Sequence, residues 1–270
     1  MARVHPLVVL APVLAGAALF LRERHERQKS ERLSAGTLET LLNAIDANDP
    51  VTGAHVRRVA TYSLTLAAAA EVDEAERRSI ERVALFHDIG KIDEAITDIF
   101  HDTSALTPEE RRAVETHPAL GAQVLEPLAA FYPDLSNGVL AHHERWDGQG
   151  YPQRLKGAMI PIVARVVSIA DTFDAITHSR RYSQGRSFEV AVGTIRDGRG
   201  AQFDPQLVDL FLTPEVLSCI EEEMRAAHAP QRRGHRRRRA AMNQAPDIKF
   251  RWRTESGGRH RRDQLTRKSR

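Results

Sequence analysis

The chain has 270 residues, with 39 lysines and arginines, 36 aspartates and glutamates, and one cysteine, Cys219. This length allows one core of roughly 150–200 residues with extensions at both ends, so a second large domain is not expected. A single cysteine excludes an internal disulfide framework. The formal charge of +3 conceals an asymmetry, because residues 231–270 hold 15 basic against 3 acidic residues and the preceding part holds 24 against 33.

The N-terminal segment from Val4 to Leu21 is apolar except for His5. As a helix it would be roughly 27 Å long, slightly short of a bilayer core. Basic residues follow it directly and would hold that side in the cytoplasm: Arg22, Arg24, Arg27 and Lys29. We therefore predict an inner-membrane anchor over residues 1–21, a linker over 22–36 and a cytoplasmic body. The alternatives are a signal peptide cleaved near residues 15–17 and a disordered or core-packed N-terminus.

Residues 37–228 have the periodicity of helices, so we predict an all-α domain. Apolar residues recur at helical spacing in two early stretches: Leu38, Leu41, Leu42 and Ile45, then Val56, Val59, Ala60, Leu64 and Ala67. Residues 107–110 (Thr-Pro-Glu-Glu) and Asp204-Pro205 are helix-start signals. Short hairpins near the glycines of residues 148–157 remain an alternative there.

Residues 229–270 lack this periodicity and are rich in arginine, so we predict a disordered basic tail. Such a tail could contact anionic lipid or nucleic acid through its charge. The alternative is a solvated extension without a partner.

A histidine and an aspartate end one of the predicted helices. Ile80, Val83, Ala84 and His87 follow helical spacing, which places His87 on the buried face, and Asp88 is next to it. We expect Gly90 to end this helix. A single buried histidine is more often a hydrogen-bonded core residue than a ligand, so the other histidines decide the interpretation.

Further histidines and one more aspartate are expected to face inward. His55 lies in the first turn of a predicted helix, His117 precedes a proline at a helix break, and His142 and His143 end an apolar run. Asp171 lies on the apolar face of a helix, where a buried carboxylate requires a charged partner.

Together these residues form a ligand set for two divalent metals: His55, His87, Asp88, His117, His142, His143 and Asp171. Imidazole and carboxylate without thiolate suit iron, manganese, cobalt, nickel or zinc better than calcium, and iron or manganese is our first choice. We expect Asp88 to bridge the two ions. A water activated between them would attack phosphorus, and Lys91 would stabilise charge on the phosphoryl oxygens.

Two segments resemble the naming motifs of the HD-GYP phosphodiesterases. They are His87-Asp88-Ile89-Gly90-Lys91 and the run from His142 to Pro152, His-His-Glu-Arg-Trp-Asp-Gly-Gln-Gly-Tyr-Pro. The resemblance extends over about residues 37–212. It implies a helical bundle around a metal centre that hydrolyses cyclic diguanylate to the linear dinucleotide or GMP. It also implies that the seven residues above are the metal ligands, with Asp88 and Lys91 catalytic.

The same resemblance implies substrate contacts from Lys91, Gly150, Tyr151, Arg180 and Tyr182. Family members with a third metal usually have a glutamate four residues before the first histidine, where this chain has Val51, so two metals are expected.

The substrate side departs from the family pattern. Asp102, Ser183 and Gln184 stand where basic residues are common, which predicts weak affinity for cyclic diguanylate. Two alternatives stay open. One is a phosphohydrolase acting on another nucleotide, and the other is a catalytically weak signalling scaffold that binds a partner protein through residues 148–152.

Overall fold

The computed structural model describes residues 6–92, 107–178 and 185–228. These ranges contain helices and no strand, which confirms the predicted all-α class and leaves the alternative hairpins near residues 148–157 without support. The basic tail lies outside the described residues.

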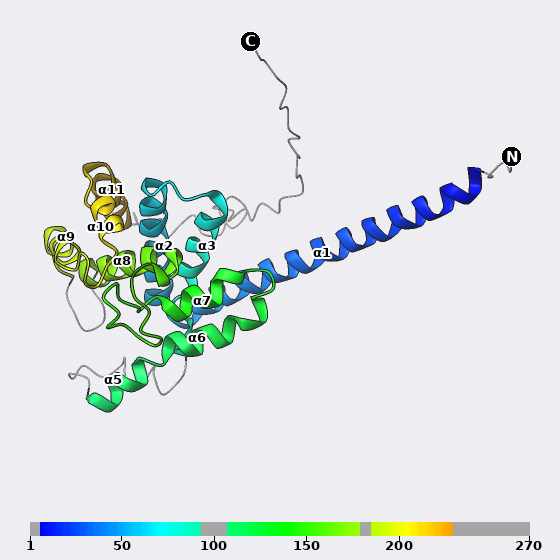
Figure 1. The fold of residues 1–270 in the computed structure, drawn as a ribbon. Helices are drawn as coiled ribbons and strands as arrows, with labels where there is room; N and C mark the ends of the chain where they lie inside the picture. Colours follow the sequence, from blue (N-terminus) through cyan, green and yellow to red (C-terminus); the bar gives the residue numbers. More distant parts are fainter. Residues whose placement is uncertain (1–5, 93–106, 179–184, 229–270) are drawn as a thin grey trace, which may run out of the picture. The chain divides into compact units, whose positions relative to one another are not determined.

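The α-helices, in chain order (Figure 1), are α1 (Pro6–Asn48), α2 (Pro50–Ala69), α3 (Glu74–Phe86), α5 (Pro108–Val114), α6 (His117–Leu125), α7 (Pro133–Ala141), α8 (Ile162–Thr177), α9 (Phe188–Asp197), α10 (Pro205–Phe211) and α11 (Pro214–His228). Short 3-10 helices are η1 (Ile89–Ile92), η2 (Glu126–Leu128) and η3 (Gly157–Met159).

The chain divides into two units, residues 39–231 and residues 1–38 with 232–270. In the smaller unit the described residues, 6–38, all belong to α1. This helix runs unbroken from Pro6 to Asn48. Residues 22–36, predicted as a linker, are therefore part of a helix. Among the described residues, no helix carries a stretch long and apolar enough to span a bilayer. The anchor over residues 1–21 stays a prediction.

Side-chain caps fix where several helices begin. The Asp49 carboxylate accepts a hydrogen bond from the Val51 backbone N–H at 3.0 Å and starts α2, with Pro50 in its first turn. The capping box predicted at residues 107–110 is present at the start of α5. Asp204 caps α10, as predicted. Each cap satisfies backbone donors that a helix leaves unpaired at its N-terminus.

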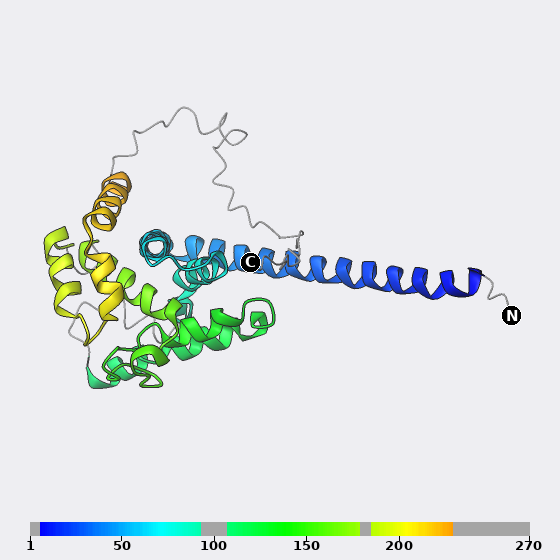
Figure 2. The same cartoon turned by 45° about the horizontal axis from the view of Figure 1, so that its top comes forward.

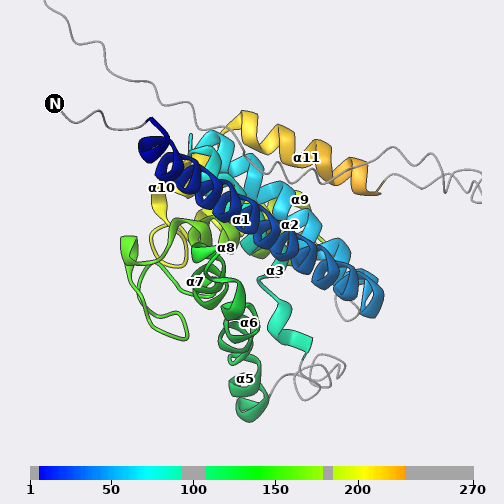
Figure 3. The ribbon, with the colours of Figure 1, turned by 90° about the vertical axis from the view of Figure 1, so that its right-hand side faces the viewer.

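The core of the larger unit forms where α2 and α3 pack against α8. Phe173 of α8 lies at its centre, fully buried, and makes edge-to-face contacts with Tyr62 of α2 and Phe211 of α10. Helices α6 and α7 lie side by side (Figures 2 and 3), and α7 also contacts α3 and α8. This arrangement brings the ends of α3, α6 and α7 toward α2 and α8.

Gly90 does not end a helix, contrary to the prediction. Helix α3 ends at Phe86, and Gly90 lies in η1, which packs against α6. A Cβ atom at Gly90 would lie 2.6 Å from the Gly121 backbone nitrogen and 2.9 Å from the His117 carbonyl carbon. The glycine is required because two backbones meet there.

Candidate metal centre

Three histidines lie at helix ends and fix their rings in the same way. His87 and His142 follow the last residues of α3 and α7, and His117 begins α6. In each, Nδ1 bonds the carbonyl oxygen three residues earlier: Ala84 at 2.7 Å for His87, Val139 at 2.6 Å for His142, and Val114 at 2.7 Å for His117. A carbonyl oxygen only accepts, so Nδ1 carries the proton and Nε2 of the neutral ring presents a lone pair.

The predicted ligands gather into two groups whose ligand atoms lie within 4.8 Å of one another: His55, His87 and Asp171 in the first group, and His117, His142 and His143 in the second. In the first group, Asp171 Oδ1 is 3.3 Å from His55 Nε2 and 3.7 Å from His87 Nε2. His55 itself lies in the second turn of α2, one turn later than predicted.

Asp88 lies between the two groups. Its Oδ2 is 3.5 Å from His87 Nε2 and 3.7 Å from His55 Nε2, whereas its Oδ1 is 3.5 Å from His117 Nε2. One carboxylate thus faces both groups, each with a different oxygen. This is the arrangement expected of a ligand shared by two cations.

The polar atoms of this cluster fit a metal better than they fit one another. His55 Nε2, His87 Nε2 and Asp88 Oδ1 are buried and have no hydrogen-bond partner among the described residues. An unsatisfied buried polar atom costs about 1–3 kcal/mol. Buried nitrogen and oxygen atoms grouped within 4.8 Å of one another suit a cation, and an imidazole and carboxylate set suits a divalent transition metal.

Lys91 lies beside Asp88, with its Nζ 2.7 Å from Asp88 Oδ2. The side chain is 22% exposed, so its ammonium group is at the edge of the cluster. Burial alone would raise the pKa of Asp88, but Lys91 and His87 outweigh it and hold that pKa well below its usual range. The pKa of Asp171 is likewise held low against its burial, chiefly by the imidazole of His55, whose Nε2 lies 3.3 Å from its Oδ1. Both carboxylates are therefore ionised, as ligands must be.

Burial has the opposite effect on the imidazoles of the second group. It holds the pKa of His142 well below the usual value and lowers that of His143 to about 3, so both rings are neutral. For His55, burial also lowers the pKa, but Asp171 and Asp174 outweigh it and raise the pKa to about 9. In the metal-free protein His55 is therefore protonated near neutral pH and would lose a proton on binding a cation, whereas the rings of His142 and His143 are already neutral.

Tyr151, a predicted substrate contact, packs against a predicted ligand. Its ring stacks on that of His143, with centroids 5.0 Å apart and planes inclined by 30°. Its backbone N–H also donates to the His143 carbonyl oxygen at 3.3 Å. The tyrosine therefore lies at the centre, where it supports His143.

The loop that carries Tyr151 is closed by a buried carboxylate. Glu144 accepts backbone hydrogen bonds from Gln153 at 2.6 Å and Leu155 at 3.0 Å. Gly150 packs against this residue, since a Cβ atom there would lie 2.5 Å from Glu144 Cα. The position gives Gly150 a packing role; its predicted substrate contact stays a prediction.

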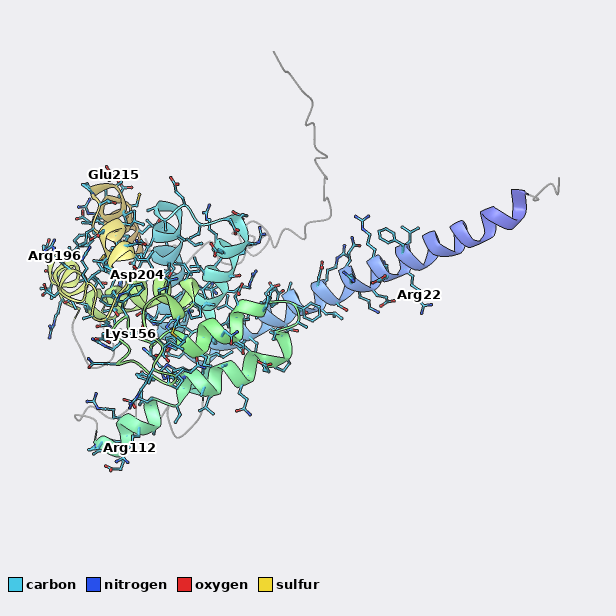
Figure 4. The ribbon with its side chains drawn as sticks, in the orientation of Figure 1. Arg22, Arg112, Lys156, Arg196, Asp204 and Glu215 are labelled. Atoms are coloured by element: carbon cyan, nitrogen blue, oxygen red, sulfur yellow. The ribbon has the colours of Figure 1, made fainter. Side chains whose placement is uncertain are left out.

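The same loop is joined to the segment before α10. The backbone N–H groups of Trp146 and Asp147 donate to the carbonyl oxygens of Gln202 and Ala201, at 3.1 and 2.9 Å. Figure 4 labels Lys156 on this loop and Asp204 at the neighbouring start of α10. Two segments far apart in the sequence therefore hold the loop in place.

Asp174, Arg58 and His178 were not among the residues predicted from the sequence. Asp174 accepts a hydrogen bond from His55 Nδ1 at 2.7 Å and from Arg58 Nε at 2.7 Å, and it lies 3.0 Å from His178 Nδ1. The available signal was spacing: Asp174 follows Asp171 by three residues on α8, and Arg58 follows His55 by three on α2. Such spacing places pairs on one side of a helix.

Several predicted residues lie outside the described part of the chain. These are the substrate contacts Arg180 and Tyr182, together with Asp102, Ser183 and Gln184. Val51, the position linked to a third metal, is described and is 48% exposed in the first turn of α2.

Comparisons with known proteins agree with this geometry. The family model for the HD domain matches residues 39–207. Over 174 residues the chain is 37% identical to a 3'3'-cGAMP-specific phosphodiesterase 2 of Vibrio cholerae, covering 64% of this chain and 33% of that protein. Over 194 residues it is 34% identical to the cyclic di-GMP phosphodiesterase response regulator RpfG of Xanthomonas campestris. That match covers 71% of this chain and 49% of RpfG.

Among solved structures, the HD domain of the L. monocytogenes phosphodiesterase PgpH in complex with cyclic-di-AMP is similar, with a TM-score of 0.50 and 18% identity. The match covers 70% of this chain and 97% of that one and shows a common fold. The chain spans between a third and a half of the length of the two curated relatives.

Proposed function

Because the chain belongs to the HD-domain family and carries the motifs of its HD-GYP members, we propose that it is a metal-dependent phosphodiesterase acting on a cyclic dinucleotide. The observation that carries the proposal is the position of Asp88 between two groups of three ligands. The curated relatives named as phosphodiesterases of such molecules support the substrate class.

When bound, two divalent ions supply Lewis acidity, which lowers the pKa of a water and compensates charge on phosphoryl oxygens. Asp88, which faces both groups, would contribute to holding both ions. His55, His87 and Asp171 would complete one set of ligands, and His117, His142 and His143 the other. Their fixed rings and ionised carboxylates allow binding with little rearrangement of the protein.

Lys91 and Tyr151 are the chain's own groups at the edge of this centre. The Lys91 ammonium lies beside Asp88 and would donate to a phosphoryl oxygen whose negative charge grows in the transition state. Tyr151, already stacked on His143, would border the same space and help to place the dinucleotide.

For the substrate itself we propose cyclic diguanylate, bound weakly because Asp102, Ser183 and Gln184 replace basic residues. The second candidate is 3'3'-cGAMP, which is favoured by the 37% identity to a relative named for that molecule. Both share the phosphodiester ring and differ only in one base.

Product analysis tests the proposal. Protein purified and loaded with iron or manganese under anaerobic conditions is incubated with cyclic diguanylate, 3'3'-cGAMP and cyclic-di-AMP at equal concentrations. We expect linear dinucleotide or mononucleotide from at least one of the first two, and none from Asp88→Asn. Metal-loaded protein that hydrolyses none of the three would refute the cyclic dinucleotide phosphodiesterase and leave the two alternatives, a phosphohydrolase acting on another nucleotide and the signalling scaffold.

A further inference from the structure

Asp174 is a buried carboxylate behind His55, where it faces Nδ1, the ring nitrogen opposite the Nε2 that faces Asp171. It is 1% exposed and follows the ligand Asp171 by one turn of α8. Its Oδ2 accepts hydrogen bonds from His55 Nδ1 at 2.7 Å and Arg58 Nη2 at 2.9 Å, and its Oδ1 accepts from Arg58 Nε at 2.7 Å. The carboxylate thus joins a predicted ligand to a guanidinium group.

This partner distinguishes His55 from the other anchored histidines. His87, His117 and His142 bond backbone carbonyl oxygens three residues away, whose positions follow from their own local backbone. The ring of His55 depends on a side chain from another helix. A carboxylate is also a stronger acceptor than a peptide carbonyl, so it makes the opposite ring nitrogen a better donor to a cation.

Arg58 completes the arrangement. It lies one turn after His55 on α2 and binds both oxygens of Asp174, which fixes the carboxylate in rotation as well as in position. Its side chain is 21% exposed, whereas that of Asp174 is 2% exposed, so Arg58 compensates the buried charge from the protein surface. Without Arg58 the carboxylate would keep His55 and His178 as partners but lose its bidentate contact.

We propose that Asp174 and Arg58 are positioning residues for one metal ion, the one held by His55, His87 and Asp171. The ion held by His117, His142 and His143 does not depend on them, because two of those rings are anchored on backbone carbonyls and the third stacks on Tyr151. This inference rests on the metal centre of the proposed function. It adds that the two ions differ in what sets their affinity.

The test compares stepwise metal affinities of full-length wild type, Asp174→Asn and Arg58→Gln, measured by titrating cobalt(II) into metal-free protein against a chromophoric chelator. Loss of the carboxylate that holds a ligating imidazole from behind commonly weakens metal binding about 10–100-fold. We expect one dissociation constant to rise by about that factor in Asp174→Asn, less in Arg58→Gln, and the other to stay within about threefold. The cobalt(II) absorption of the weakened site should change with it.

Asp204→Asn is the matched control. Asp204 is 3% exposed and pairs with Arg165 at 2.5 Å, so this variant also breaks a buried carboxylate–guanidinium pair, but one that touches no predicted ligand. It should lower thermal stability and leave both dissociation constants unchanged. A His143→Ala background, which disables the second group, should retain the full effect of Asp174→Asn, whereas a His55→Ala background should remove it.

The outcomes separate the two proposals. If both constants rise equally, or if Asp204→Asn changes them as much as Asp174→Asn, the positioning role is overturned. Wild-type protein that binds no metal overturns the centre and this inference together. Protein that binds two ions with the predicted asymmetry but hydrolyses no cyclic dinucleotide refutes the proposed phosphodiesterase activity and supports the positioning role. Should Asp174→Asn fail to fold, Arg58→Gln decides, since it leaves every carboxylate in place.

Discussion

Gly90→Ala tests whether the contact between η1 and α6 sets the position of the centre. Gly90 lies two residues after the proposed shared ligand Asp88, and its backbone faces the first turns of α6. The new Cβ atom would be 2.6 Å from the Gly121 nitrogen and 2.9 Å from the His117 carbonyl carbon. Both neighbours are backbone atoms, so neither can rotate out of the way.

The geometry sets the magnitude. Heavy-atom contacts in protein interiors are comfortable at about 3.5–4.0 Å, so the two backbones must separate by roughly 1 Å. Overpacking of this kind typically costs about 1–3 kcal/mol. For a domain of this size, each kcal/mol lowers the melting temperature by about 2–4 °C, so we expect a fall of about 2–12 °C. Because the displaced turn carries His117, affinity for the ion of the second group should fall as well.

The assay is thermal unfolding of the metal-free protein, followed by cobalt(II) titration. Gly193→Ala is the matched control, since Gly193 lies within α9 and a Cβ atom there would meet nothing within 4 Å. Alanine should stabilise that helix by about 0.5–1 kcal/mol, so the two variants should shift the melting temperature in opposite directions. A Gly90→Ala protein as stable as the control, with unchanged metal affinity, would refute the importance of this contact.

Three further predictions concern Asp88, Lys91 and the C-terminal tail. Asp88→Ala should abolish turnover and lower the metal content measured by elemental analysis; unchanged metal content would refute the shared ligand. Lys91→Ala should keep both metals and reduce the turnover number about a hundredfold or more, because it removes one donor to the phosphoryl oxygens; metal loss in this variant would mean that Lys91 supports the centre instead. Deleting residues 231–270 should leave the turnover number and melting temperature unchanged, and an unfolded product would contradict the predicted independence of the tail.

Helical periodicity predicted the fold class and the burial of part of the candidate centre. The spacing of Ile80, Val83 and Ala84 placed His87 on the buried face, and all four residues are buried. His117 was expected at a helix break and begins α6. These predictions succeeded because each depends on one helix, whose direction of burial follows from its own apolar residues.

The supporting contacts could not be predicted in this way, because they join residues distant in sequence. Asp174 is 119 residues from His55, and nothing in either segment specifies that α2 and α8 will be adjacent. The prediction that Gly90 ends a helix was wrong for the same reason. A glycine near a helix end usually indicates a cap, whereas this position needs glycine because the backbone of α6 lies against it.

The two motifs therefore divide their residues between chemistry and support. In the first, we propose that His87 and Asp88 are ligands and that Lys91 supplies charge, and Gly90 permits the packing that brings α6 alongside them. In the second, Glu144 provides no ligand to either group, because both its oxygens accept backbone N–H groups of the loop it closes. A substitution there should change substrate affinity through the loop without removing metal. Metal content and kinetics measured together therefore distinguish a motif residue that holds the metal from one that supports the loop.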